Sequence, residues 1–420
     1  YIGRGWCQVY PDTEWQTVEA FLADDRSRLK DCVVLLKGPS DAGFSRITKS
    51  LERNVHETIL NVDLQAVTAN FNHDRRMLRP GVQTICMVKA DAYGAGAVMV
   101  SKQLQLSGAD YLAVAVADEG VELRKAGITK PIIVMNPEMH ALRTLFAYNL
   151  QPEVYSFRLF DALVREARSE GVTDFPIHIK LDTGMHRLGF DVDKDMTELV
   201  RSMRKQKALL PISVFSHFVG ADDDAFDDFS EIQYNIFMKG ADALQAAFPH
   251  HILRHICNSA AIEHFPQRQL DMVRLGLGLY GIKPRGNALI HPVSQLTTTI
   301  LQIHELDEGE TVGYGRHTTL ERRSRIAAIP IGYADGLNRR LGNRKGYCIV
   351  NGRRADYVGN ICMDVAMIDV TDIRCKEGDR AVIFGSDRIP VTALSEALGT
   401  IPYEILTSVS NRVQRIYFRE

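Results

Sequence analysis

Short apolar runs alternate with amphipathic segments between residues 82 and 280, and this repetition limits the folds open to the chain. The runs cover residues 82–89, 111–117, 131–136, 151–156, 176–182, 211–217, 251–259 and 271–280. Segments between them, such as FRLFDALVREARSEGV, repeat apolar residues every three or four positions, as an amphipathic helix requires. Strands that alternate with helices in this way predict an α/β fold, a (β/α)8 barrel of the TIM type.

The pattern changes near residue 290. Segments such as RSRIAAIPIGYAD and KGYCIVNGRRADYVGNICMDVAMIDVT are β-branched and interrupted by glycine turns, as strands are. We therefore expect the barrel to occupy residues 54–290 and a mainly β C-terminal domain to occupy residues 291–420. The strand-like residues 56–64 could pair with either unit. We expect residues 1–53 to form a small α/β N-terminal extension, which is too short to bury much surface alone.

The composition indicates which kind of molecule the protein binds and in which cellular compartment it works. The net charge is −2 and the charged residues are interleaved, so no broad basic face forms; we expect no nucleic-acid partner and a small-molecule site instead. The seven cysteines include no CxxC pair, which disfavours a disulfide framework and a metal site and favours the cytoplasm. No apolar stretch predicts a membrane span. Because the chain begins at Tyr1, we expect it to be a piece of a longer polypeptide.

Polar residues stand at the ends of several predicted strands. Catalytic side chains of a parallel barrel come from the carboxyl ends of its strands, which meet on one face. Singly, a lysine could extend to solvent, a histidine could be a hydrogen-bonded core residue and an arginine could pair with a carboxylate. Together they predict a shared pocket, formed by Lys89, Lys180, His217, Asn258, Ser259 and Arg274.

The residue types in this predicted pocket point to one cofactor. Lys89 ends an apolar run, and burial would lower the pKa of its ammonium, so that the free amine can form a Schiff base with pyridoxal phosphate. NSAAI and RLGLG supply a serine hydroxyl and backbone N–H groups after strands seven and eight, where barrels commonly hold phosphate. DAYGAGA lacks the full GxGxxG of a dinucleotide loop.

An ordered set of motifs from about residue 56 to the end resembles the alanine racemase family. The motifs are MVKADAYGAGAV, KLDTGMHRLGF, SHFVGADD, CNSAAI, RLGLGLYG, VGYGRH, IPIGYADGL, GNICMDVAMID and IPYEILTSVSNRVQRIY. The resemblance implies a pyridoxal-phosphate enzyme with a barrel and a β domain. It also implies interconversion of L- and D-alanine for peptidoglycan synthesis, by a homodimer whose active sites are shared between subunits.

The resemblance also assigns roles to individual residues. Lys89 would hold the cofactor and act as one catalytic base, and Tyr314 of the partner subunit would be the other. Arg274 would face the pyridine nitrogen and His217 the ring. The phosphate would be held by Tyr93, Ser259, the backbone of Gly276 and Leu277, and Tyr403, and Asn258 would also bind the cofactor. The substrate would meet Arg187, Met363 of the partner subunit and, on the entry path, Tyr333.

Two positions near Arg187 add detail to this resemblance. Lys180 matches a lysine that is carbamylated in many members of the family. His186 stands in DTGMHR where many relatives have glycine. A tyrosinate at 314 would need neighbouring positive charge or strong hydrogen-bond donors, for which Arg187 and His217 are the candidates.

Other functions stay open at this point. The same fold could racemise or decarboxylate another amino acid, or bind pyridoxal phosphate without catalysis, although Tyr314 and the β domain argue against a simple carrier. Within residues 1–53, VVLLKGPSDAGFSRITKSLE resembles the C-terminal end of UDP-MurNAc-tripeptide D-alanyl-D-alanine ligase, a Mur ligase, with KGPS in place of the usual KGSR. No phosphate-binding GxxxxGK[ST] loop is present, so we expect a fragment of a fused ligase and racemase without ligase activity.

Overall fold

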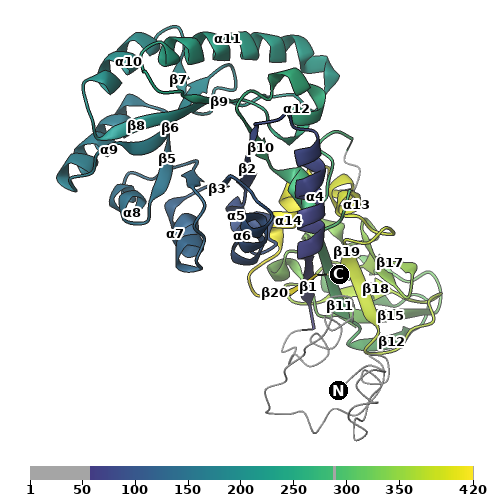
Figure 1. Ribbon diagram of the computed structural model, residues 1–420. Coiled ribbons are helices and arrows are strands. Elements are labelled where there is room, and N and C mark those ends of the chain that lie inside the picture. Colours follow the sequence, from purple (N-terminus) through teal and green to yellow (C-terminus); the bar gives the residue numbers. More distant parts are fainter. Residues whose placement is uncertain (1–56, 287–289, 420) are drawn as a thin grey trace, which may run out of the picture.

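The computed structural model describes residues 57–286 and 290–419. The predicted Mur-ligase-like segment, residues 1–53, lies outside the described residues. Figure 1 shows two units, a helix-flanked barrel drawn mostly in purple to teal and a β domain drawn mostly in green to yellow. In the described residues, no helix combines the length and the apolar character needed to cross a bilayer.

The barrel has the parallel strands that the sequence predicts. They are β2 (Gln83–Met87), β3 (Tyr111–Val114), β4 (Ile132–Val134), β5 (Leu150–Val154), β6 (Phe175–Asp182), β8 (Leu209–Phe215), β9 (Leu253–His255) and β10 (Met272–Leu275). Their order in the sheet is β10-β2-β3-β4-β5-β6-β8-β9, with the short β7 (Phe190–Asp191) paired to β6. Backbone hydrogen bonds from Asp271 to Arg254 (3.1 Å) and from Arg274 to Cys257 (3.0 Å) link β10 to β9, so the ring is nearly closed.

Helices between the strands cover the outside of the barrel. They are α6 (Ala97–Leu106), α7 (Ala117–Lys125), α8 (Leu142–Ala147), α9 (Phe157–Ser169), α10 (Met196–Arg204), α11 (Asp227–Gln245) and α12 (Ser259–His264). In α9 the apolar spacing has its predicted effect, because Leu159, Leu163 and Ala167 recur every four residues and all are buried. Ser156 begins this helix by accepting a hydrogen bond from the backbone N–H of Leu159 at 3.3 Å.

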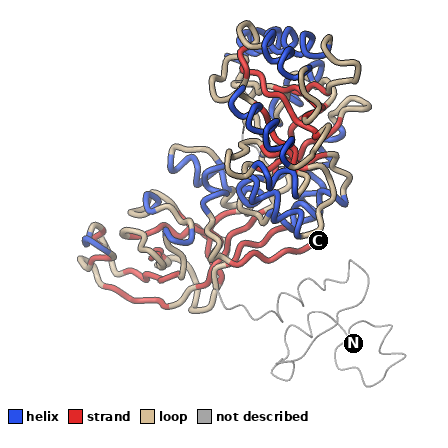
Figure 2. The backbone as a smooth tube through the Cα atoms, turned by 90° about the vertical axis from the view of Figure 1, so that its left-hand side faces the viewer, coloured by secondary structure: helices blue, strands red, loops and turns tan. Residues whose placement is uncertain are grey.

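The C-terminal unit is built on a second sheet, which lies below and to the left of the barrel in Figure 2. Its strand order is β12-β15-β18-β17-β16-β19-β11-β1-β20. The strands are β1 (Ile59–Asp63), β11 (Ser294–Thr299), β12 (Gln302–Leu306), β15 (Ser324–Ile329), β16 (Tyr347–Val350), β17 (Arg353–Val358), β18 (Ala366–Asp369), β19 (Arg380–Phe384) and β20 (Gln414–Phe418). The strand that precedes the barrel therefore pairs with the C-terminal sheet, antiparallel to β11 and parallel to β20.

Shorter elements complete the two units. The helices are α4 (Leu64–Arg76), α5 (Lys89–Tyr93), α13 (Val391–Leu398) and α14 (Pro402–Ser408), and β13 (Thr311–Val312) pairs with β14 (Thr318–Thr319). The 3-10 turns are η2 (Asp224–Phe226), η3 (Pro266–Arg268), η4 (Leu277–Tyr280), η5 (Tyr314–Arg316), η6 (Tyr333–Asp335) and η7 (Arg339–Leu341).

A close backbone approach joins α14 to the barrel. A Cβ at Gly94 would lie 2.3 Å from the carbonyl oxygen of Leu406, and the φ of Gly94 is +80°, so both space and conformation require glycine here. Arg415 of β20 donates a hydrogen bond to the Gly94 carbonyl at 3.1 Å. This junction holds α14 where its residue Tyr403 lines the barrel pocket.

Candidate active site

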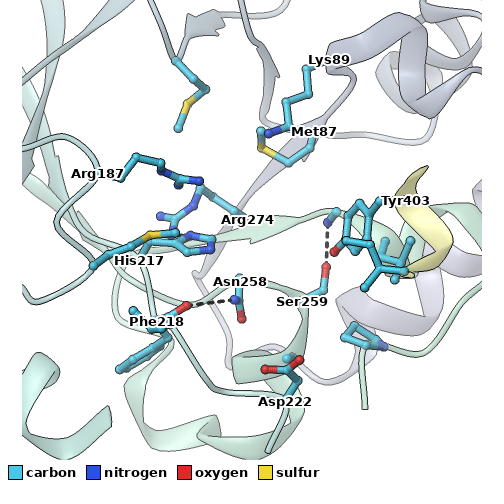
Figure 3. Close-up of a pocket in the computed structure, with 18 of the residues that line it drawn as sticks. Met87, Lys89, Arg187, His217, Phe218, Asp222, Asn258, Ser259, Arg274 and Tyr403 are labelled. Atoms are coloured by element: carbon cyan, nitrogen blue, oxygen red, sulfur yellow. Dashed lines mark hydrogen bonds between the residues drawn. The ribbon is translucent and has the colours of Figure 1, made fainter. Parts of the chain in front are cut away.

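A cavity of about 960 Å³ opens at the carboxyl ends of the barrel strands. Most of the predicted site residues line it, and Figure 3 shows side chains from opposite sides of the barrel converging on one space. These lining residues are Lys89, Tyr93, Lys180, Arg187, His217, Asn258, Ser259, Arg274, Gly276, Leu277 and Tyr403.

Lys89 lies at the start of an unusual backbone turn. One residue, Val88, separates it from the end of β2, and the residues after it, Ala90 to Tyr93, all have φ between 51° and 54°. This left-handed turn costs about 1–2 kcal/mol per non-glycine residue and persists only where the surroundings hold it. Glu119 provides such a hold, because its carboxylate accepts hydrogen bonds from the backbone N–H groups of Ala90 at 2.6 Å and Ala115 at 2.7 Å.

The environment of Lys89 favours its free amine. The side chain is half-buried. Burial lowers the pKa of the Lys89 ammonium from its ordinary value, the neighbouring Arg187 guanidinium lowers it further, and Glu119 and Glu153 only partly oppose the effect. The neutral amine, which is the nucleophile toward an aldehyde, is therefore more available than on an exposed lysine.

Arg274 starts a chain of hydrogen bonds across the barrel interior. Because a guanidinium can only donate, Arg274 donates to Nδ1 of His255 (2.7 Å) and leaves the His255 proton on Nε2. That proton is donated to the Ser213 hydroxyl (3.2 Å), which donates to Nδ1 of His178 (2.6 Å). His178 then donates to Oε1 of Gln151 (3.0 Å), so one fixed cation sets the direction of every bond in the chain.

Arg274 also keeps His217 neutral. The guanidinium is 4% exposed and donates to Nδ1 of His217 at 3.2 Å and to the Ser216 and Ile256 carbonyls at 2.7 and 3.0 Å. Burial, reinforced by Arg274, lowers the pKa of His217 well below its ordinary value. A neutral His217 supplies no positive charge to a tyrosinate, so of the two predicted candidates only Arg187 can supply charge, whereas His217 keeps the proton on Nε2 as a hydrogen-bond donor.

A small polar cradle lies on the opposite side of the cavity. The backbone N–H of Gly276 donates to the Ser259 hydroxyl at 2.7 Å, and a Cβ at Gly276 would lie 3.4 Å from Tyr93 Oη and 3.6 Å from Ser259 Oγ. Tyr93 is itself buried, with its ring 5.6 Å from that of Tyr403. Hydroxyls and N–H groups around a space that one side-chain carbon would fill match a phosphate group, and with Lys89 across the cavity the residues fit pyridoxal phosphate.

Asn258 has a structural task beside this cradle. Its Oδ1 accepts a hydrogen bond from Ala261 N at 3.0 Å and so caps the N-terminus of α12, while its amide reaches the Phe218 carbonyl at 3.5 Å. These bonds fix the position of Ser259, the next residue in the chain.

Three predicted site residues lie outside the cavity. Tyr314, Tyr333 and Met363 are on the β domain and are 70%, 44% and 53% exposed. Hydrogen bonds bring their segments together, because the side-chain amide of Asn360 donates to the Tyr314 carbonyl at 2.8 Å and the backbone N–H of Tyr333 donates to the Cys362 carbonyl at 3.1 Å. They form one exposed surface, defined here as the Tyr314 surface.

The backbone at His186 adopts a conformation that favours glycine. Its φ is +54°, in the left-handed region that favours glycine. Asp182 offsets this cost by accepting hydrogen bonds from the His186 backbone N–H and from Nδ1 of its ring, both at 3.0 Å.

Sequence reasoning missed three polar residues of this site: Glu119, Glu153 and His255. Glu119 and His255 act through other residues and belong to no recognisable sequence motif. Glu153 does carry a signal, because it is a charge inside the predicted strand QPEVYS, just as Lys89 is a charge at the end of another.

Comparisons with known proteins agree with this architecture. The family model described as "Alanine racemase, N-terminal domain" matches residues 62–284, and "Alanine racemase, C-terminal domain" matches residues 293–417. An alanine racemase of Clostridium tetani is 37% identical over 370 residues, which is 86% of this chain and 95% of that protein.

Solved structures give the same result. An alanine racemase of Clostridium difficile 630 has a TM-score of 0.82 and 33% identity over 86% of this chain and 96% of its own. One from Bartonella henselae, solved with covalently bound pyridoxal phosphate, has a TM-score of 0.78 and 28% identity over 86% of this chain and 99% of its own.

Proposed function

This chain belongs to the alanine racemase family, and we propose that it exchanges the α-proton of alanine between Lys89 and Tyr314 of the partner subunit. The family consists of pyridoxal-phosphate-dependent isomerases that interconvert L- and D-alanine. The observation that carries the proposed roles is a lysine of lowered pKa in a cavity that also offers a phosphate cradle.

The proposed cofactor contacts use the two sides of the cavity. Lys89 would hold the aldehyde carbon, the cradle of Tyr93, Ser259 and Gly276 would hold the phosphate, and Arg274 would face the pyridine nitrogen. When bound, pyridoxal phosphate withdraws electron density from the α-carbon and so acidifies its proton. Arg274 stays protonated and donates without giving up its proton, which limits this withdrawal and disfavours side reactions.

Racemisation requires proton transfer on both faces of the α-carbon. Lys89 serves one face, and a second group must serve the other, each as a base in one direction and as an acid in the reverse. Tyr314 lies on an exposed surface of the same chain and not in its cavity, which supports donation by a second copy. Arg187 would hold the substrate carboxylate together with Met363 of the partner subunit, and Tyr333 of the partner subunit would line the entry path.

Mixing two inactive variants tests the shared site. Lys89→Ala and Tyr314→Phe homodimers should each lose racemisation. After denaturation, mixing and refolding, random pairing leaves one intact site in each mixed dimer, so about a quarter of wild-type activity should return. A mixture that regains no activity although mixed dimers form, shown by two affinity tags, would refute the shared site.

The attachment of the cofactor is tested separately. Borohydride reduction of the holoenzyme followed by peptide mapping should label Lys89. Lys180, which lines the same cavity, is the built-in control, and labelling there would overturn the assignment.

We also propose that residues 1–53 are the end of a Mur ligase fused to this racemase, which would couple D-alanine production to peptidoglycan synthesis. The support is the VVLLKGPS motif, and the family match begins only at residue 62. Deletion of residues 1–53 should leave the kcat and KM of racemisation unchanged; a loss of dimers or activity would show another role.

The cytoplasm is the proposed location. The cysteines in the described chain, Cys86, Cys257, Cys348, Cys362 and Cys375, are free thiols, the form maintained in a reducing compartment. Fractionation of the native host should recover the racemase with cytoplasmic markers.

A further inference from the structure

Glu153 is the only buried carboxylate among the described residues that line the cavity. It is 2% exposed, whereas the other acids there, Asp222, Asp223 and Asp224, are exposed. A carboxylate in such a position costs several kcal/mol of hydration unless nearby cations compensate it.

Strand geometry directs Glu153 into the barrel. Residues two apart share one face of a strand, and Gln151 of β5 faces inward because it accepts a hydrogen bond from His178. Glu153 is therefore on the same face, in register with His178 of the neighbouring β6. Lys180 is two residues beyond His178, so it also faces inward and lines the same cavity.

Four cations share the cavity with this carboxylate. Lys89, Lys180, Arg187 and Arg274 all line the cavity with Glu153. Burial raises the pKa of Glu153, and Lys180, Arg274, Arg187 and Lys89, in decreasing order, pull it back. With Glu153 neutral, the two nearly buried cations Lys180 and Arg274 would have no buried anion in the cavity, so the charge balance favours the ionised carboxylate.

The surroundings of Lys180 suit an ammonium group. Its Nζ lies 4.3 Å from the centroid of the Phe215 ring, within the range of a cation–π interaction. Burial lowers the pKa of Lys180, and Glu153 provides the largest opposing effect. A carbamate on Lys180 would carry a negative charge, which both the Glu153 carboxylate and the negative face of the Phe215 ring would repel.

We propose that Glu153 is the fixed anion of the active site: it keeps Lys180 protonated and positions Arg187 for the substrate, so that Lys180 is not carbamylated. Glu153 is thus a positioning residue, which acts through Lys180 and Arg187. The claim that Glu153 positions Arg187 for the substrate rests on the proposed function, whereas the claim that Lys180 stays protonated does not.

The proposal predicts that the wild-type protein and the Glu153→Gln variant respond differently to carbon dioxide. Carbamylation requires the neutral amine: its nitrogen attacks the carbon of carbon dioxide, one C=O electron pair moves to oxygen, and the proton leaves to solvent. The wild-type holoenzyme in ¹³C-bicarbonate should show no carbamate resonance assigned to Lys180, and its rate should not depend on bicarbonate. In Glu153→Gln the ammonium loses its anion, so the Lys180 carbamate should form.

Kinetics provide the second readout. Glu153→Gln without bicarbonate should raise the KM for L-alanine about tenfold or more, because Arg187 loses its counter-charge, and bicarbonate should restore part of this loss. The Lys180→Met substitution added to Glu153→Gln should abolish the restoration. Glu122→Gln, which makes the same substitution at an exposed carboxylate of helix α7 outside the cavity, is the matched control and should leave KM unchanged.

Two results would overturn the proposal. One is a Lys180 carbamate in the wild-type holoenzyme, a measurement that does not depend on whether any variant folds. The other is a Glu153→Gln holoenzyme with wild-type KM and no bicarbonate response. Failure of the proposed function would instead appear as borohydride labelling away from Lys89, which leaves the carbamate measurement valid.

Discussion

Replacing Glu119 by glutamine should release the backbone turn that presents Lys89. The carboxylate accepts the N–H groups of Ala90, immediately after Lys89, and of Ala115, after β3. It thereby ties the ends of two adjacent barrel strands together. Glutamine has the same shape but only one acceptor oxygen, so its amide N–H₂ would face either the backbone N–H of Ala90 or those of Ala115 and Val116.

The structure sets the size of this effect. A hydrogen bond to a charged group contributes about 1.5–3 kcal/mol, and glutamine forfeits one of two. We therefore expect the free energy of unfolding to fall by about 2 kcal/mol. The left-handed residues Ala90 to Tyr93 would relax once this hold weakens, and an amine displaced by about 1 Å would lower kcat/KM by roughly 10- to 100-fold.

Three measurements on each protein decide the outcome: unfolding in urea, the yield of borohydride-trapped cofactor, and kcat/KM for L-alanine. Glu122→Gln is the matched control, because Glu122 is an exposed residue of the same helix α7, and it should change unfolding by less than about 0.5 kcal/mol. Reduced stability of Glu119→Gln with wild-type kcat/KM would refute the reasoning that this carboxylate positions Lys89.

Three further substitutions test the other parts of the site. Arg187→Leu should raise the pKa of Lys89, because it removes a cation, so reconstitution of the apoenzyme with pyridoxal phosphate should require higher pH; an unmoved pH profile would contradict this. Arg274→Glu should increase transamination per racemisation turnover, measured as pyridoxamine phosphate formed, and an unchanged ratio would count against the role of Arg274. Gly276→Ala places a methyl group in the cradle, in ordinary contact with Tyr93 and Ser259, so titration should show cofactor binding weakened about 10- to 100-fold; equal binding would mean that the phosphate lies elsewhere.

The fold was predictable where local periodicity decides it. The alternation of strands and helices specified the barrel, and the β-branched, glycine-interrupted segments specified the second sheet. The partner of residues 56–64 was not predictable, because alternation shows that a strand has a buried face but not which strand lies beside it. That choice depends on β20, which is more than 300 residues away in the chain.

The site residues at strand ends were predictable for a geometric reason. Parallel strands bring their carboxyl ends to one face, so chemistry-bearing side chains there must gather, and the cavity confirms that Lys89, His217, Ser259 and Arg274 do. The position of Tyr314 relative to a second copy follows from association between chains, which leaves no periodic trace in one sequence.

Glu153 and Lys89 pose the same physical problem, and the sequence alone solved only one of them. Each is a charge within an apolar strand, so each needs a compensating partner or a chemical use. Lys89 is followed by glycines and other motif residues, which suggest that it binds a cofactor. The compensation for Glu153 depends on strand register, because β5 places it opposite His178, two residues before Lys180 on the same inward face. Register is fixed by the whole barrel, so this pairing of charges becomes visible only once the strands are assembled.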